Sequence, residues 1–182
     1  MTLIQGELLL SYKNNNTIPI VMGTDENYVM LTSVAMWSIL ASSSPSTQYK
    51  FYIMLHGDVY DTALAVFSQV INKYSNAQIE YLNMKSLFEE FDRLEEGHIT
   101  FAAYYRMMIP DLLKGHSKCL YLDGDIIACC DLYELYKIEL GNDYIAGVKQ
   151  IINQTLPPPQ QRNIAREQGF QLLTFTLIQA CC

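Results

Sequence analysis

Hydrophobic residues along this chain follow two patterns: short continuous runs, and longer segments in which they recur every three or four positions. The continuous runs stop at polar or glycine-containing loops and predict buried strands over residues 18–23, 49–56, 77–82, 119–122 and 144–148. The recurring pattern predicts helices over residues 28–41, 58–74, 84–91 and 99–113, and a helical turn at 132–136. In the first helix, the repeat consists of Val29, Leu31, Val34, Trp37 and Leu40. Strands that alternate with helices predict an α/β domain with a largely parallel sheet.

Polar residues directly follow two of the predicted strands. Thr24 and Asp25 come after the run IPIVMG, and the triplet Asp123-Gly124-Asp125 comes after CLYL. Open α/β sheets bind their ligands beyond the carboxyl ends of the strands. The sequence therefore predicts a site where these two strand ends lie.

The D-G-D triplet has three interpretations. Asp-Gly is common in tight turns, but a turn does not require the second aspartate. Two carboxylates at the edge of a core are costly unless a cation holds them, and Mg²⁺ or Mn²⁺ binds carboxylate oxygens while leaving room for a diphosphate. The stretch LYLDGDII also resembles the nucleophile strand of haloacid-dehalogenase-like phosphatases. That motif normally lies near the chain start and is followed by Thr or Val, whereas Ile126 follows here.

Composition and charge narrow the classes of function. Of the 182 residues, 50% are hydrophobic and 17% are charged, which indicates a packed core. The formal net charge of −7, without a basic run, argues against nucleic acid as the main partner. We expect no transmembrane segment and no signal peptide. Five cysteines without the spacing of a disulfide framework or zinc site predict free thiols, and hence a cytoplasmic protein, at most peripheral to the inner membrane face.

Three linked segments resemble family 8 of the retaining glycosyltransferases, which includes bacterial lipopolysaccharide galactosyl- and glucosyltransferases and glycogenin. The segments are IPIVMGTDENYVMLTSVAMWSIL, ITFAAYYRMMIPDLL and KCLYLDGDIIACCDLYELY, and the resemblance covers about residues 17–150. It implies a GT-A fold, which is a Rossmann-like, mostly parallel sheet with flanking helices. It also implies transfer of glucose or galactose from a UDP-sugar to a saccharide or to a lipid-linked or protein-linked glycan, with retention at the anomeric carbon.

The resemblance also implies the residues of a nucleotide-sugar site. The uridine would be bound by Thr24, Asp25, Asn27 and Tyr28, with the Tyr28 ring stacked on the base. The nucleotide would lie along His98 and Ile99, and the donor sugar or diphosphate would be reached by Arg106. A plain structural alternative is a core-packing aromatic for Tyr28 and a solvated loop residue for His98.

The same resemblance makes Asp123 and Asp125 the ligands of Mn²⁺ or Mg²⁺, with Gly124 letting the backbone approach the ribose. Gln150 stands near the position where family members usually have an acidic residue that contacts the sugar, so the donor preference is open. No catalytic nucleophile can be named from these residues.

The end of the sequence departs from the family pattern. The family's F-N-[SA]-G segment, its later acidic pair and the histidine that completes the metal site have no counterpart in the matching residues. We therefore expect an N-terminal extension (1–17), an incomplete nucleotide-sugar-binding domain (18–150) and a Pro-rich linker with an atypical tail (151–182). Codons that can encode the tail TFTLIQACC also permit an F-N-S-G segment in another frame, so a frameshift between Gly169 and Thr174 is one explanation and truncation is the other. The alternative to an active transferase is then a catalytically inactive fragment that binds UDP.

Overall fold

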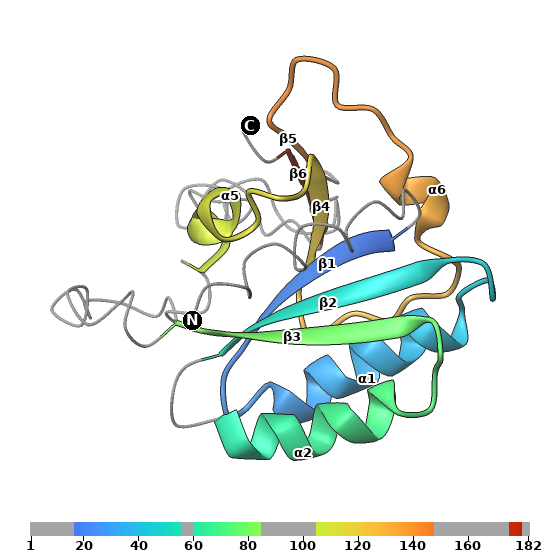
Figure 1. Cartoon of the computed structure of the whole chain (residues 1–182), viewed down its shortest axis with the longest axis vertical. Helices are drawn as coiled ribbons and strands as arrows, with labels where there is room; N and C mark the ends of the chain where they lie inside the picture. The colour runs from blue at the N-terminus through green and yellow to red at the C-terminus, as the bar shows by residue number, and fades with distance from the viewer. Residues whose placement is uncertain (1–16, 56–59, 85–104, 148–174, 180–182) are drawn as a thin grey trace, which may run out of the picture.

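The computed structural model describes residues 17–55, 60–84, 105–147 and 175–179, and their strands form one six-stranded sheet (Figure 1). The strands are β1 (Thr17–Thr24), β2 (Gln48–Leu55), β3 (Ala77–Asn83), β4 (Lys118–Leu122), β5 (Ile145–Gly147) and β6 (Phe175–Gln179). The helices are α1 (Val29–Ala41), α2 (Tyr60–Ile71), the 3₁₀ turn η3 (Arg106–Met108), α5 (Ile109–Leu112) and α6 (Tyr133–Tyr136). The predicted α/β class is confirmed.

The sheet has a parallel half and an antiparallel half. Its strand order is β3-β2-β1-β4-β6-β5, and β1 pairs in parallel with both β2 and β4, as β2 does with β3. β6 lies between β4 and β5 and is antiparallel to both. The parallel half therefore carries the strand ends at which a site was predicted.

Both faces of β1, β2 and β4 are buried, which explains why these strands are mostly apolar, whereas the edge strand β3 is partly exposed along its length. On one face, Ile18, Ile20 and Met22 of β1 belong to a hydrophobic cluster with α1 and α2, and these two helices cover the same side of the sheet (Figure 1). On the other face, Val21 packs in a second cluster with residues of β2, β4 and α5, including Tyr52 and Ile109.

Helix α1 packs on the sheet through a different face from the one the hydrophobic repeat indicated. Val29 and Leu40 are buried, but Leu31, Val34 and Trp37 are 46%, 46% and 49% exposed. The buried face consists instead of Val29, Thr32, Ser33, Ala35, Met36, Ser38, Ile39 and Leu40. Because α1 is apolar on almost every side, hydrophobicity alone does not select one face, and small hydroxyl residues let the helix lie close to β1.

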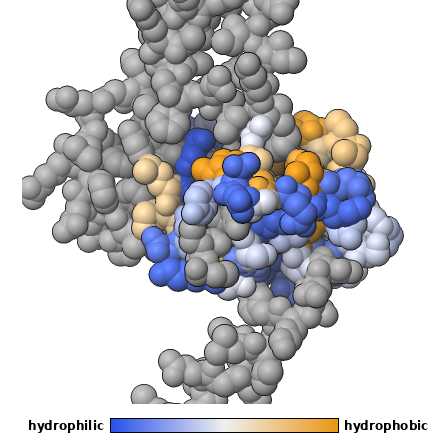
Figure 2. Space-filling view, turned by 90° about the horizontal axis from the view of Figure 1, so that it is seen from above, coloured by the Kyte–Doolittle hydropathy of each residue, from blue (hydrophilic) through white to orange (hydrophobic). Residues whose placement is uncertain are grey.

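Exposed apolar side chains are not confined to α1. On the face seen in Figure 2, apolar residues lie among hydrophilic ones in separate patches. Folded proteins normally expose much apolar surface of this kind. None of the helices in the described ranges has both the length and the apolar character needed to cross a lipid bilayer.

Three expectations about chain segments have different outcomes. The helix predicted over 84–91 lies almost entirely outside the described residues, and only the end of the 99–113 helix is described, as η3 and α5. Of the tail, residues 175–179 are described, as β6, which pairs with β4 and β5, although no strand was predicted there. The domain boundary at residue 150 stays a prediction, because residues 148–174 lie outside the described ranges.

Candidate functional site

The two strand ends singled out from the sequence lie at the same edge of the sheet. β1 and β4 are adjacent and parallel, with Ile20 opposite Leu120 and Val21 opposite Tyr121. β4 ends at Leu122, and β1 runs two residues further than the position opposite Leu122, to Thr24, which places Thr24 level with Gly124. The turn after β1, Thr24–Tyr28, and the turn after β4, Asp123–Asp125, are here called the first turn and the second turn.

A buried hydroxyl of α1 lies between the two turns. Thr32 is fully buried, and its Oγ1 donates a hydrogen bond to Thr24 Oγ1 at 3.1 Å. A Cβ atom added to Gly124 would lie 2.4 Å from the same Thr32 Oγ1, a separation that real Cβ atoms essentially never show. The glycine of the D-G-D triplet is therefore required by its packing against α1, in addition to any approach of a ribose.

Asp25 shapes the first turn. Its Oδ1 accepts hydrogen bonds from the backbone N–H groups of Asn27 (2.9 Å) and Tyr28 (3.1 Å), and its backbone carbonyl accepts from those of Tyr28 and Val29. These are donors that a helix start leaves without intrahelical partners. Tyr28, the last residue of this turn, is 41% exposed and is therefore not a buried core residue.

Replacing Asp25 by alanine should lower the free energy of unfolding by about 1 kcal/mol, because the Asn27 N–H loses its acceptor and the Tyr28 N–H keeps only the Asp25 backbone carbonyl. Asp25→Asn keeps an acceptor oxygen and should lose less. Urea unfolding of the two variants measures this difference, with Glu26→Ala, an exposed acidic neighbour, as the control. Equal stability of Asp25→Ala and the unsubstituted chain would contradict the role of the Asp25 side chain in holding the first turn.

The second turn places its two carboxylates in different environments. Asp123 is partly buried, whereas Asp125 is exposed. Burial raises the pKa of the Asp123 carboxyl to about 6; the Arg106 guanidinium opposes this shift and the Asp125 charge adds to it. Arg106 also lies over the ring of Tyr121, 5.1 Å from its centroid. The fold thus brings Arg106, from a separate segment, into electrostatic contact with the second turn.

The second turn fits a hard divalent cation whose coordination is only partly supplied by protein. Its donors are carboxylate oxygens, and the repulsion between Asp123 and Asp125 is relieved by a cation between them. Among the described residues, no cluster of three or more His, Cys, Asp or Glu side chains could hold a metal. Mg²⁺ commonly binds through one or two carboxylates, several waters and substrate phosphates, so two carboxylates suffice for a metal–diphosphate site.

The raised pKa of Asp123 predicts that the metal-free chain becomes less stable to unfolding when this carboxyl ionises. The folded state holds this proton more tightly than the unfolded state, so stability is lost as pH rises from about 4 to about 6. Asp123→Asn removes this cost and should be more stable than the unsubstituted chain by about 1 kcal/mol at pH 7, after allowance for solvent screening of a partly exposed group. Urea unfolding of both chains at pH 4.5 and pH 7, with a chelator present, tests this. A difference in stability between Asp123→Asn and the unsubstituted chain that does not grow with pH would contradict the prediction.

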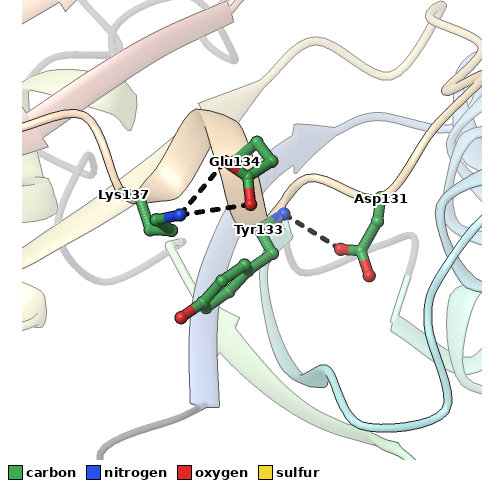
Figure 3. Close-up of polar contacts among 4 residues, drawn as sticks. All are labelled: Asp131, Tyr133, Glu134 and Lys137. Carbon is green, nitrogen blue, oxygen red and sulfur yellow. Dashed lines mark hydrogen bonds and ion pairs between the residues drawn. The ribbon is translucent and has the colours of Figure 1, made fainter.

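Asp131 ties the chain that follows the second turn to the start of β2. Figure 3 shows its local hydrogen bond with the backbone of Tyr133. Its Oδ2 accepts hydrogen bonds from Ser44 N (2.7 Å) and Thr47 Oγ1 (2.6 Å), and its Oδ1 accepts from Tyr49 Oη (2.6 Å) and Tyr133 N (2.9 Å). Burial raises the pKa of this carboxyl, but the hydrogen bonds from these four donors outweigh burial and hold the pKa below its usual value. Sequence reasoning missed this residue, because three of its partners lie more than 80 positions away in the chain.

Two serines of the α1 end hold the middle of the same segment. Ser38 Oγ accepts a hydrogen bond from Ala128 N at 2.9 Å, and Ser42 Oγ donates to the Ala128 carbonyl, also at 2.9 Å. Together with Asp131, they fix the backbone from the second turn to α6 along the length of α1. The second turn is therefore held from both sides, by β4 before it and by this segment after it.

The remaining predicted site residues lie outside the described ranges. These are His98, Ile99 and Gln150, whose roles stay predictions. Of the predicted residues that are described, Thr24 and Gly124 lie against the same hydroxyl, and Arg106 acts on Asp123. The structure thus brings together members of all three segments on which the sequence resemblance rests.

Comparison with known proteins is consistent with this geometry. The family model described as "Glycosyl transferase family 8" matches residues 19–172. General stress protein A of Bacillus subtilis (strain 168) is 27% identical over 139 residues, which are 75% of this chain and 48% of that protein. Glycosyltransferase GlyB of Streptococcus pneumoniae serotype 4 is 30% identical over 136 residues, which are 74% of this chain and 32% of that protein. The chain thus spans half or less of the length of these relatives.

Solved structures support the fold. A galactosyltransferase LgtC in complex with donor and acceptor sugar analogues superposes with a TM-score of 0.65 at 24% identity, covering 90% of this chain and 58% of that one. The apo structure of the bifunctional glycosyltransferase WbbM gives a TM-score of 0.69 at 17% identity, covering 91% and 32%. The expectation of a GT-A fold is confirmed.

Proposed function

The chain belongs to glycosyl transferase family 8, and from that premise we propose that it forms the donor-binding part of a metal-dependent transferase that takes a hexose from a UDP-sugar. The observation that carries this proposal is the convergence of the first turn, the second turn and Arg106 at one edge of the sheet. A nucleotide-sugar needs a surface for its base and a cationic environment for its diphosphate. The two turns offer these from neighbouring strands.

In this proposal, different residues bind the base, the nucleoside and the diphosphate of the donor. The exposed ring of Tyr28 stacks on the uracil, and the backbone of the first turn, shaped by Asp25, borders the nucleoside. Asp123 and Asp125 hold Mn²⁺ or Mg²⁺, which, when bound, supplies Lewis-acid stabilisation of the leaving diphosphate. The Arg106 guanidinium, stacked on Tyr121 and close to Asp123, adds a fixed positive charge on the diphosphate side.

Binding of UDP tests the donor site directly. Calorimetry with UDP should show micromolar affinity in the presence of Mn²⁺ and a loss of about tenfold or more with a chelator, because a diphosphate beside two carboxylates requires the cation. CDP and ADP at the same Mn²⁺ concentration are the matched controls for the base. Absence of binding to a chain shown to be folded by circular dichroism, or equal binding of all three nucleotides, would contradict the proposal.

A second candidate function is UDP binding without transfer. The two carboxylates of the second turn are the only metal ligands proposed among the described residues, and they form no cluster of three potential ligands there. Turnover separates the two candidates. Release of UDP from UDP-glucose or UDP-galactose with Mn²⁺ supports the transferase, whereas UDP binding with no release from either donor supports the binding function. The acceptor, in either case a saccharide or a glycan on a lipid or protein, is left open.

A further inference from the structure

We propose that Thr32 is a positioning residue that sets the distance between the two turns of the donor site, so that the base and the metal–diphosphate unit are bound in one geometry. This inference rests on the proposed function and deepens it. Thr32 lies on the buried face of α1 and is 0% exposed, so it acts on the donor only through the two turns. It was not among the residues that the sequence pointed to.

On the side of the first turn, Thr32 begins a short chain of hydrogen bonds. Its Oγ1 donates to Thr24 Oγ1 at 3.1 Å, and Thr24 Oγ1 in turn donates to the backbone carbonyl of Asp25 at 3.3 Å. That carbonyl also accepts the N–H groups of Tyr28 and Val29, which begin α1. Thr32 therefore holds the exit of β1 against the helix that the first turn opens.

On the side of the second turn, the same oxygen limits how closely β4 can approach. A Cβ at position 124 would lie 2.4 Å from Thr32 Oγ1, but 3.5 Å from Thr32 Cβ and 3.6 Å from its Cα. The hydroxyl oxygen is thus the Thr32 atom that most closely borders the space beside the Gly124 Cα, and it leaves no room for a side chain there. Because Gly124 lies between Asp123 and Asp125, this close packing against α1 fixes where the second turn places both carboxylates.

One hydroxyl oxygen therefore borders both turns: it bonds to Thr24 in the first turn and excludes a side chain at position 124 in the second. A metal–diphosphate unit and a stacked base belong to one ligand, and displacing one subsite by a fraction of an ångström relative to the other weakens the binding of the whole ligand. The hydroxyl contributes in two ways, through its hydrogen bond to Thr24 and through the small size of oxygen against Gly124. Substitutions can separate these two contributions.

Thr32→Val replaces the hydroxyl by a methyl group of similar shape, and Thr32→Ser keeps the hydroxyl. We expect Thr32→Val to raise the Kd for UDP with Mn²⁺ about five- to tenfold, the effect of one buried hydrogen bond, and Thr32→Ser to restore binding to within about twofold of the unsubstituted chain. Ser33→Ala is the matched control, because Ser33 is also buried on α1 and its hydroxyl, within the described part of the chain, bonds only inside the helix, to the Met30 carbonyl. Its Kd should be unchanged.

A second experiment tests the contact with Gly124. Gly124→Ala should raise the same Kd by about tenfold or more, and the effect should shrink when it is made in Thr32→Ala, where the nearest remaining atom is the Cβ at 3.5 Å. Circular dichroism establishes that each variant is folded. If Gly124→Ala prevents folding by itself, recovery of folding in the double variant is the same signature. Additive effects of the two substitutions would overturn the contact.

The outcomes separate this inference from the function on which it rests. If the unsubstituted chain does not bind UDP with Mn²⁺, the proposed function fails and the positioning role fails with it. If the unsubstituted chain binds and Thr32→Val binds equally well, the donor site stands and the positioning role of Thr32 is overturned. A loss in Thr32→Val that Thr32→Ser does not share, with thermal unfolding midpoints within about 3 °C of each other, supports it.

Discussion

Replacing both aspartates of the second turn, as Asp123→Asn/Asp125→Asn, should raise the Kd for UDP in the presence of Mn²⁺ about 100-fold or more, to the value measured with a chelator. Amide groups keep the shape of the carboxylates but remove the negative charge that holds a hard divalent cation, and without the cation the diphosphate lies beside a site that no longer attracts it. Calorimetry with UDP, with and without Mn²⁺, measures the effect. The double variant should also stay folded, because Asp123 is destabilising when ionised and partly buried.

The control for this variant must change the charge of the chain equally. Asp111→Asn/Asp143→Asn removes two exposed carboxylates elsewhere in the described part of the chain and raises the formal net charge of −7 by the same two units. It should bind UDP with Mn²⁺ as the unsubstituted chain does. Metal-dependent binding that persists in Asp123→Asn/Asp125→Asn would show that the D-G-D triplet is a turn only, which was the first of the interpretations considered for it.

Replacing Asp131 by alanine should lower the free energy of unfolding by about 2–4 kcal/mol, the largest stability effect expected of any surface-accessible residue discussed here. The carboxylate accepts four hydrogen bonds, two from backbone N–H groups and two from hydroxyls, one of which is that of the buried Tyr49. Removing the acceptor leaves this hydroxyl, the Thr47 hydroxyl and the N–H groups of Ser44 and Tyr133 without this partner. Asp131→Asn keeps one acceptor oxygen, so its stability should lie between those of the unsubstituted chain and Asp131→Ala.

The same helical turn supplies a matched control. Glu134 forms an exposed i,i+3 ion pair with Lys137. Figure 3 shows this pair together with Asp131. Exposed pairs contribute little, so Glu134→Ala should change stability by less than about 0.5 kcal/mol in the same urea titration. Because hydrogen bonds hold the pKa of Asp131 below its usual value, its contribution is present above pH 4 and is lost as pH falls further. Equal stability losses for Asp131→Ala and Glu134→Ala would contradict the role assigned to Asp131.

Local pattern was sufficient to predict the parallel half of the sheet. Runs such as IPIVMG are buried on both faces, so each is apolar throughout and ends visibly at a polar residue. The face of α1 was not predictable in this way, because Leu31, Val34 and Trp37 repeat as regularly as the residues that are buried. The strand β6 was missed because the apolar tail has no neighbouring pattern to show which strands it joins.

The residues of the candidate site also fall into those that the sequence could reveal and those that it could not. Asp25, Asp123 and Asp125 could be found because carboxylates at strand ends stand out against apolar runs. Thr32 and Asp131 could not, because their importance lies in contacts with distant segments: Thr32 reaches Gly124 across the sheet edge, and Asp131 reaches Thr47 and Tyr49. A threonine in a helix and an aspartate before a helical turn are ordinary in sequence, and only the structure shows that Thr32 is buried and Asp131 half-buried.

The pairing of β1 with β4 has a consequence for how the chain folds. β1 and β2 are close in sequence, as are β2 and β3, but Ile20 pairs with Leu120, a hundred residues later. During synthesis the β1–α1–β2–α2–β3 half is complete long before β4 leaves the ribosome, and the apolar edge of β1 has no strand beside it until then. Such an edge is a template for pairing with another chain. We therefore expect this edge of β1 to stay open to pairing with other chains until β4 closes it, so that the donor site, whose second turn follows β4, forms only after the first half of the sheet.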